Sequence, residues 1–296
     1  MVLRSGGAQI APVESESRMK ISITGASGFI GRHLVLHAIQ SGHRAVAVSR
    51  RNLGEQGLFN DTDIVIHLAG IAQATNSDDE YMAVNHRLTL SVARKAREAG
   101  CSRFVFVSSA AAATSASAYG RSKAAAERDL SSISGMQVVV VRPPLVYGQD
   151  AKGSFAALVR LASLPLPLPF KGGSRLRSAL YVGNLVDALL FCCTSTSIRM
   201  GPYSVTDDAD LSLEQMISHL REGMGRRQIL FSAPWLEPAL KAIGRERLAH
   251  QLFGEMRFPN ELAHQGWSPP HRPQDALTEI GRSRRPNACS PEASGF

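Results

Sequence analysis

The first half of the chain alternates between short apolar runs and longer segments with helical spacing. "MKISITG" alternates apolar and polar residues, and "TDIVIHLAG", "RFVFVSS" and "MQVVVVRPP" are almost continuously apolar, as expected of strands buried on both faces of a parallel sheet. Helical spacing follows the first strand and recurs in "YMAVNHRLTLSVARKAREAG" and in the segment headed by Tyr119. This alternation predicts an α/β fold with a doubly wound, Rossmann-type parallel sheet and a ligand at the carboxyl ends of its strands.

The alternation breaks down near the middle of the chain, which suggests a second structural unit. We expect residues 19–148 to form a dinucleotide-binding core. Residues 149–281 would form a smaller C-terminal substrate-binding lobe, from which about 181–206 return to the core. Residues 1–18 are expected to be a loose tail, and residues 282–296, which have little apolar content, a disordered one.

A glycine-rich turn joins the first strand to the first helix, at Gly25, Gly28 and Gly31. In such a turn the glycines allow a tight bend, close approach of the backbone to a pyrophosphate, and close packing of helix on strand. The anion then lies at the N-terminus of the helix. A strand before the motif and a helix after it supply the context that a dinucleotide site requires.

The second predicted strand, "RAVAVS", ends in Arg50 and Arg51. An NAD-selective site normally presents Asp or Glu here to the ribose hydroxyls, whereas guanidinium groups suit a 2′-phosphate. We therefore expect NADP or NAD as the cofactor, with NADP slightly preferred. The alternative is that both are ordinary surface arginines.

Tyr119 and Lys123 stand four residues apart at the head of a predicted helix, so they share one face. A nearby ammonium favours the phenolate and lowers a tyrosine pKa from about 10 toward neutrality. Such a tyrosine is a usable general acid or base. A chance pairing is the alternative, and the pair alone does not decide between them.

Composition narrows the class of protein. The chain has 296 residues, 44% of them hydrophobic, no apolar run near the roughly 18 residues of a membrane span, and four cysteines without metal-ligand or disulfide spacing. The net charge of +8 is dispersed and fits an anionic small ligand. We expect a cytoplasmic protein with no metal, no nucleic-acid partner and no membrane partner.

A series of motifs occurs in one order across roughly residues 20–190, and Asn85 belongs to it. The others are "TGASGFIG", "VIHLAG", "FVFVSSA", "YGRSK", "RPPLVYG" and "LPLPFKGGSRLRSALYVGNLVDAL". They resemble the extended short-chain dehydrogenase/reductase family, in its NAD-dependent epimerase/dehydratase branch. Within that branch they are most similar to bacterial C4-epimerases and 4-keto-reductases that serve surface polysaccharide synthesis.

The resemblance implies a role for each matched residue. Tyr119 would exchange a proton with the sugar, Lys123 would lower its pKa and hold the nicotinamide ribose, and Ser109 would bind the same substrate oxygen, with Ser108 still possible in its place. Arg177 or, less favoured, Arg175 would meet the nucleotide diphosphate. The cofactor-binding residues would be Gly25, Ser27, Gly28, Phe29, Ile30, Gly31, Arg50, Leu68, Ala69, Gly70, Tyr119, Lys123 and Pro143.

The sequence departs from the family pattern in three places. Twelve residues separate Arg50 from Asp63, too few for the strand and helix that relatives carry, so we expect that edge strand to be lost or rudimentary. The segment before Tyr119 is also short, and it could place Ser115 or Ser117 near the substrate oxygen. Leu145 stands where several nucleotide-sugar enzymes have an asparagine.

The expected function is hydride transfer at C4 of a UDP- or dTDP-linked sugar, as 4-keto reduction or 4-epimerisation, in a homodimer. Two alternatives stay open. One is a catalytically silent NAD(P)-binding regulatory protein, and the other is a reductase of a non-sugar ketone.

Overall fold

The computed structural model describes residues 18–72, 77–172 and 175–285. The expected N-terminal tail, apart from Arg18, and residues 286–296 of the expected C-terminal tail lie outside the described residues.

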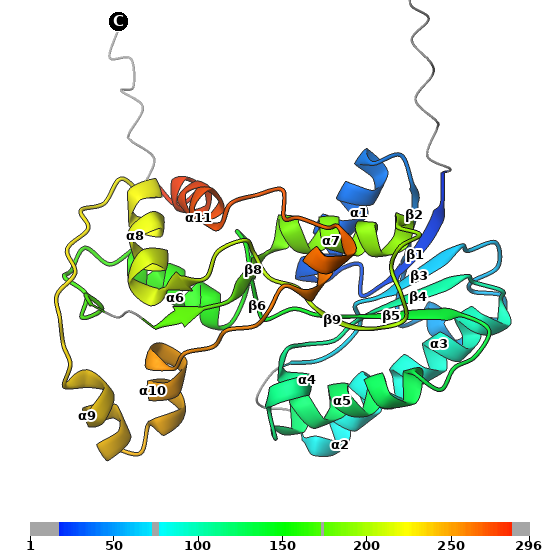
Figure 1. Ribbon diagram of the computed structural model, residues 1–296, viewed down its shortest axis with the longest axis horizontal. Helices are drawn as coiled ribbons and strands as arrows, with labels where there is room; N and C mark the ends of the chain where they lie inside the picture. Colours follow the sequence, from blue (N-terminus) through cyan, green and yellow to red (C-terminus); the bar gives the residue numbers. More distant parts are fainter. Residues whose placement is uncertain (1–17, 73–76, 173–174, 286–296) are drawn as a thin grey trace, which may run out of the picture.

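A six-stranded sheet, all of whose pairings are parallel, forms the core and confirms the predicted fold class (Figure 1). Its strand order is β2-β1-β3-β4-β5-β9. The strands are β1 (Lys20–Thr24), β2 (Arg44–Val48), β3 (Ile64–His67), β4 (Arg103–Val107), β5 (Gln137–Arg142) and β9 (Gly201–Ser204). The central strands β3 and β4 are buried, except for half-buried Arg103 at the start of β4, which explains their apolar runs.

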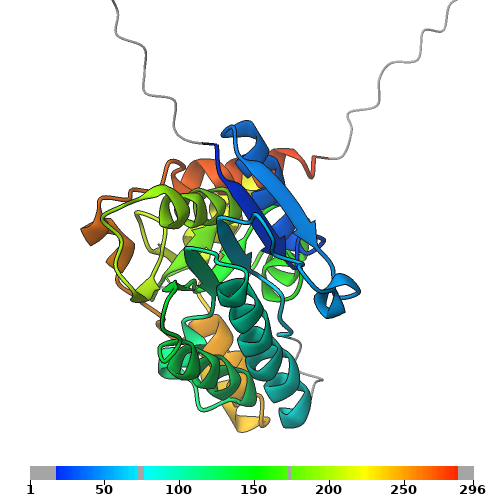
Figure 2. The same ribbon diagram turned by 90° about the vertical axis from the view of Figure 1, so that its right-hand side faces the viewer.

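Helices cover both faces of the sheet and give three layers (Figure 2). One face packs on α1 (Phe29–Gln40) and α7 (Val182–Thr194), and the other on α3 (Thr89–Glu98) and α5 (Ala118–Leu130). A short helix α2 (Asp78–Tyr81) and a π-helical segment η2 (Met82–Leu88) lead into α3. Together these three segments form the helix that the apolar spacing predicts up to Gly100.

The connection from β2 to β3 is short, as the sequence predicts. It contains one 3-10 turn, η1 (Asn52–Gly54), and no strand. The chain passes across β1 and forms β3 on its other side, so the direction of winding reverses between β1 and β3. In open parallel sheets a ligand binds at this reversal, outside the carboxyl ends of the strands.

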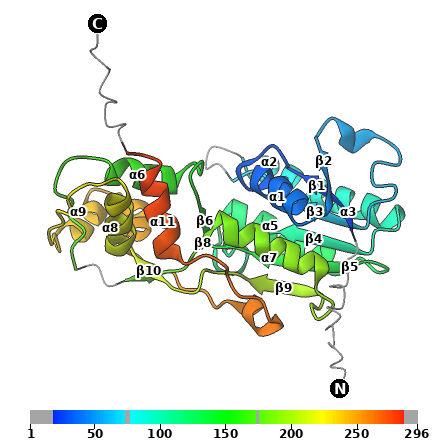
Figure 3. The same ribbon diagram turned by 90° about the horizontal axis from the view of Figure 1, so that it is seen from above.

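The second unit is a lobe with its own apolar core, beside the carboxyl ends of the sheet (Figure 3). It contains the strand pairs β6–β8 and β7–β10 and several short helices. Its elements are β6 (Leu145–Tyr147), α6 (Ser154–Ala162), β7 (Leu176–Arg177), β8 (Ala179–Tyr181), β10 (Leu211–Ser212), α8 (Leu213–Gly223), α9 (Leu236–Ala242), α10 (Glu246–Phe253) and α11 (Pro273–Arg282). Between α10 and α11, the 3-10 helix η3 (Glu261–Gln265) packs on the core, where Glu261 accepts from the amide of Ser204 in β9.

The packing of α8 against α11 depends on two glycines. A Cβ atom at Gly223 would lie 2.0 Å from the carbonyl oxygen of Thr278, and one at Gly281 would lie 2.3 Å from that of Leu220. Both contacts are with backbone atoms, which cannot move aside without shifting a helix. The two helices can therefore approach this closely only without side chains at the crossing.

We predict that Gly223→Ala destabilises the protein by about 3 kcal/mol, because overpacking at a rigid contact forces the backbone to shift. Chemical denaturation of the purified variant measures this loss. Gly54→Ala is the matched control, since a Cβ at Gly54 meets nothing within 4 Å. An unfolding midpoint for Gly223→Ala equal to that of the control would contradict the close crossing.

Candidate active site

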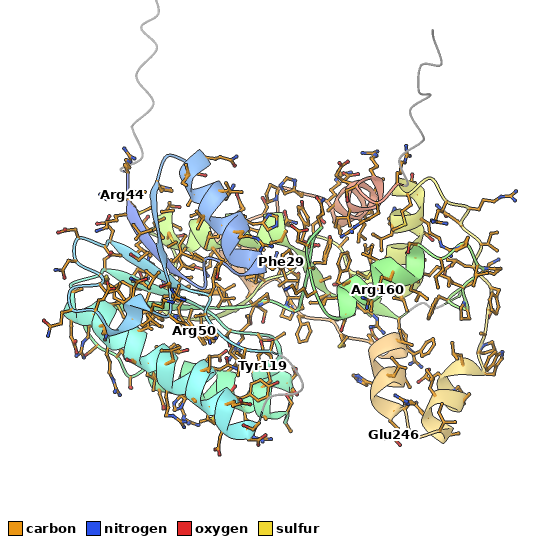
Figure 4. All side chains as sticks on the ribbon, turned by 180° about the vertical axis from the view of Figure 1, so that it is seen from behind. Phe29, Arg44, Arg50, Tyr119, Arg160 and Glu246 are labelled. Atoms are coloured by element: carbon orange, nitrogen blue, oxygen red, sulfur yellow. The ribbon has the colours of Figure 1, made fainter. Side chains whose placement is uncertain are left out.

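The carboxyl ends of β1, β3, β4 and β5 meet at one edge of the sheet, on the side of the lobe (Figure 3). Each strand is followed by residues that the sequence marks as functional. Figure 4 shows two of them, Phe29 at the start of α1 and Tyr119 at the start of α5, at the end of the core that faces the lobe.

The glycine turn after β1 packs against the turn after β3. Gly25 adopts a φ of 71°, and a Cβ there would lie 2.8 Å from the amide nitrogen of Ala69. A Cβ at Gly31 would lie 2.3 Å from the carbonyl oxygen of Gly25. The first and third glycines therefore allow the tight bend and the close packing that the motif predicts.

The start of α1 is suited to bind an anion. Gly28 is its N-cap, no side chain caps the helix, and the first turn has no acidic residue. Ser27 and Gly28 are exposed, whereas Phe29 and Ile30 are half-buried. The amide groups at the start of α1 are thus not capped by any side chain, and with the helix dipole they can bind the pyrophosphate of a dinucleotide.

Gly70, after β3, lies against the helix that carries the predicted lysine. A Cβ at Gly70 would be 3.0 Å from Oδ1 of Asn85 and 3.3 Å from Nζ of Lys123. Any side chain here would displace the two polar groups. Together with Leu68 and Ala69, this turn brings predicted cofactor residues to the edge where the winding reverses.

Asn85 fixes the geometry of this turn. Its Oδ1 accepts a hydrogen bond from the amide of Ile71 at 2.9 Å, and its Nδ2 donates to the carbonyl of Ile71 at 3.0 Å and to Oγ of Ser122 at 3.1 Å. The residue is buried in η2, and π-helical segments often mark functional sites. Sequence reasoning included Asn85 in a motif but assigned it no role, since its partners are distant in the chain.

A second buried residue, His67 at the end of β3, was missed. Thr89 donates its hydroxyl proton to the carbonyl of Asn85 at 2.9 Å, so it can only accept from Nε2 of His67, at 3.1 Å. Nδ1 of His67 is then an acceptor for the hydroxyl of Thr24, at 2.7 Å. Thr24 accepts in turn from the amide of Ala69 at 3.4 Å. The ring is therefore a neutral bridge between the ends of β1 and β3 and the start of α3.

Lys123 is buried beneath these turns. Its Nζ donates to the carbonyl of Val107 at 2.9 Å and lies 4.7 Å from the ring centroid of Phe106. Burial lowers the pKa of Lys123 from 10.5 to about 8, and the carboxylate of Glu127, one helical turn further on, acts in the opposite direction.

Tyr119 hydrogen-bonds the side chain of Ser109, which joins the two predicted catalytic residues. Burial raises the pKa of Tyr119, the hydrogen bond with Ser109 acts in the opposite direction, and the phenol of Tyr81 raises it further. The prediction that Lys123 makes this phenol acidic is therefore wrong for this structure. The lysine ammonium is bound by a backbone carbonyl, and desolvation has the largest effect on the phenol.

Ser108 has a different environment from Ser109. It is buried, and its hydroxyl donates to Oε1 of Glu127, which also forms a two-point ion pair with Arg142. Ser109 is half-buried, and its Oγ accepts from the amide of Ala111 at 3.2 Å. The geometry thus favours Ser109 over Ser108 as a substrate contact.

Ser115 and Ser117 have local structural roles. Ser117 is the N-cap of α5 and accepts from the amide of Gly120 at 3.1 Å, and Ser115 donates to Ser117 at 2.9 Å. The short segment before Tyr119 forms a helix of its own, α4 (Ala111–Thr114), whose end packs on α5 where Gly120 has no side chain. These contacts position the phenol of Tyr119.

The remaining predicted residues lie around this cluster. The carbonyl of Pro143, after β5, accepts from the amide of Ala110 at 2.9 Å and supports the loop that carries Ser109. Arg50 is exposed just beyond β2. Arg177 lies on β7 of the lobe, in a different sheet, and burial lowers its pKa, as does the charge of Arg175. Among the described residues, no group of three or more potential metal ligands occurs.

A parallel sheet with a glycine turn at its winding reversal, and with a Ser–Tyr–Lys set beside it, defines a nicotinamide-dependent enzyme of the short-chain dehydrogenase/reductase type. Residues 21–201 match the model of the NAD dependent epimerase/dehydratase family. The chain belongs to this family.

Individual relatives agree with this assignment. The chain is 27% identical to a UDP-glucose 4-epimerase of Vibrio cholerae, over 89% of this chain and 94% of the relative. Its fold is similar to that of a UDP-N-acetylglucosamine 4-epimerase from Bacillus cereus (TM-score 0.73, 18% identity, 90% and 100% coverage). It is also similar to MoeE5 in complex with UDP-glucose and NAD (TM-score 0.69, 23% identity, 90% and 98% coverage). No helix within the described ranges is long and apolar enough to span a membrane.

The shifted pKa of Lys123 predicts a pH-dependent stability. Between about 8 and 10.5 the unfolded chain binds a proton that the folded protein has lost, so stability rises with pH through this window. We expect the free energy of unfolding, relative to that of Lys123→Met, to rise by about 3 kcal/mol across the full window. Denaturant titrations of both proteins at a series of pH values measure this slope. Lys152→Met, which replaces an exposed lysine, is the control. If the stability difference between wild type and Lys152→Met changed with pH as much as that between wild type and Lys123→Met, the prediction would be contradicted.

Proposed function

We propose that the protein transfers a hydride at C4 of a nucleotide sugar, with Tyr119 as the general acid or base. The observation that carries the proposal is the hydrogen-bonded pair of Ser109 and Tyr119 beside buried Lys123, at the edge that also carries the glycine turn. When bound, the nicotinamide cofactor supplies the hydride chemistry. The chain must then orient the substrate and supply or remove one proton.

Each side chain has a defined part in this proposal. Tyr119 holds its proton at neutral pH, as any phenol with a pKa of about 10 does and as burial reinforces by raising that pKa. It can therefore donate the proton to a developing alkoxide. Ser109 offers a second hydrogen bond to the same oxygen. Lys123 supplies positive charge near the reacting centre and a donor for a ribose hydroxyl. Such positioning accounts for a large part of an enzymatic barrier reduction.

The lobe is the proposed site for the nucleotide. It contains a cavity of about 220 Å³ lined by Phe170, Lys171 and Arg175, with Glu237 and Phe253 on other sides. Arg175 forms an ion pair with Glu237 at 3.2 Å and so is already engaged, whereas Lys171 is exposed. The cavity combines aromatic and cationic groups, as a nucleoside diphosphate requires. The names of the relatives, which act on or bind UDP-sugars, support this substrate class.

Reduction fits better than epimerisation. A reductase consumes external NADPH, and the exposed Arg50 after β2 suits the additional phosphate. A UDP- or dTDP-linked 4-keto sugar is therefore the proposed substrate. We further propose a cytoplasmic homodimer through α3 and α5, for which the family resemblance is the support.

We predict that Tyr119→Phe lowers kcat by at least about a hundredfold, because it removes the proton donor. Cofactor affinity, measured by fluorescence titration, should stay within about twofold, since the ring remains. Turnover is followed by NADPH absorbance with a panel of nucleotide sugars. Tyr203→Phe is the control, because its hydroxyl contacts only the backbone of Arg199. Undiminished turnover in Tyr119→Phe would exclude Tyr119 as the acid.

A second prediction concerns the choice of cofactor. Arg50→Ala should raise KM for NADPH by about tenfold and leave KM for NADH unchanged, because only NADPH has a 2′-phosphate. Arg44→Ala, at the opposite end of the same strand (Figure 4), is the matched control for loss of positive charge. Equal changes with both cofactors, or a wild-type preference for NADH, would contradict a phosphate-binding role.

A further inference from the structure

Several large apolar side chains of the lobe are exposed to solvent. Most of the large apolar residues that are exposed in the described part of the chain come from two lobe segments, although the core is larger. They are Leu164, Leu166, Ile229, Phe231, Trp235, Ile243 and Leu248. We call this set the lobe apolar patch. A concentration of exposed large apolar side chains in one unit of a protein often marks a site of interaction.

Helix α9 is open to solvent. None of its residues is buried. The flanking residues Trp235 and Ile243 are exposed by 63% and 69%. Helical geometry places Pro238 and Ala242, which are also exposed, on the side of Trp235. Two large apolar side chains, one at each end of the helix, therefore remain in contact with water.

The rest of the patch is held in place by a buried arginine. The guanidinium of Arg221 donates to the carbonyls of Leu164, Leu166 and Ile229, at 2.9, 2.7 and 3.1 Å. Arg221 is 2% exposed, so these hydrogen bonds are well shielded. They fix the backbone of two segments while three of the apolar side chains remain in water. Figures 1 and 3 show α9 and the segment before it at the end of the lobe farthest from the sheet.

Cationic side chains accompany the patch. Between residues 225 and 250, the described side chains include four cationic ones, Arg226, Arg227, Lys241 and Arg245, against the two acidic ones Glu237 and Glu246, a net charge of +2. Arg227 and Arg245 are exposed. Glu237 is ion-paired with Arg175 and Lys241, and it lines the cavity behind α9. The surface beside the apolar face is therefore positively charged.

We propose that the lobe apolar patch docks on an anionic lipid surface, with α9 lying in the plane of the interface. Apolar side chains with a tryptophan would enter the headgroup boundary, and the arginines and lysines would meet lipid phosphates. A second copy of the chain fits less well. A twofold contact through this patch would bring the same cations face to face, with no matching acidic surface.

The test uses the full chain and vesicles of phosphatidylcholine with or without about one third phosphatidylglycerol. We expect flotation with the anionic vesicles, weakened by salt, and little binding to the neutral ones. Trp235 reports the contact directly, because the other tryptophan, Trp267, is 4% exposed. Its emission should shift to shorter wavelength on binding, and the shift should saturate with lipid.

Two variants separate the apolar and charged contributions. Trp235→Ser with Ile243→Ser should reduce vesicle partitioning by at least about tenfold, and Arg227→Gln with Arg245→Gln should reduce its salt dependence. The matched control is Leu36→Ser with Ile39→Ser, which removes two exposed apolar side chains, 61% and 55% exposed, from helix α1, outside the lobe. Thermal unfolding and cofactor affinity verify that each variant is folded.

Three outcomes would overturn the proposal. The first is that the protein does not bind anionic vesicles. The second is that the α1 control loses as much vesicle partitioning as the variant with Trp235→Ser and Ile243→Ser. The third is a concentration-dependent dimer that this variant no longer forms, which would identify a second copy of the chain as the occupant of the patch. Cofactor binding and nucleotide-sugar turnover are measured in the same preparations. None of the substituted residues lines the proposed nucleotide cavity, so either proposal can fail without the other.

Discussion

The geometry of the site depends on one buried charge, the ammonium of Lys123. A buried ammonium is tolerated only where acceptors or a favourable electrostatic field compensate for lost water, and here Val107 supplies the carbonyl and Phe106 the ring face. The same charge restricts its neighbours. Burial, reinforced by Lys123, lowers the pKa of His67 to about 3, so the histidine stays neutral at physiological pH. Its neutrality permits the donor and acceptor pattern that connects Thr24 with Thr89.

That pattern joins elements that are far apart in the chain. From the amide of Ala69 the hydrogen bonds run through Thr24, His67 and Thr89 to the carbonyl of Asn85. The side-chain amide of Asn85 donates to the hydroxyl of Ser122, which in turn donates to the carbonyl of Tyr119 at 2.8 Å. The turn that would contact a cofactor and the helix that carries the phenol are thus fixed by one buried network. Each group in it is satisfied, which favours a rigid, single geometry.

Much of this architecture could be predicted from the sequence because its signals are local. The apolar run before Gly25 and the helical spacing after it predict the turn correctly, and the short segment after Arg50 predicts the missing strand. The role of His67 was out of reach, since Thr24 lies 43 positions away and Thr89 lies 22. The patch around Trp235 was equally hidden, because an apolar helix face is the same in sequence whether it is buried or exposed. The pKa direction of Tyr119 was wrong because spacing along a helix reports proximity but not burial.

The raised pKa of Tyr119 has a consequence for the direction of the reaction. Under the proposed function, a phenol that keeps its proton is the donor that reduction of a carbonyl requires. Oxidation would require the phenolate, which Lys123 could favour only if its ammonium moved toward the phenol from the carbonyl of Val107. An epimerase must both oxidise and reduce the same bound sugar. By this reasoning it would need Lys123 near the phenol for oxidation and at the carbonyl of Val107 for reduction. The proposed reduction needs only a protonated Tyr119, hydrogen-bonded to Ser109, with Lys123 held at the carbonyl of Val107.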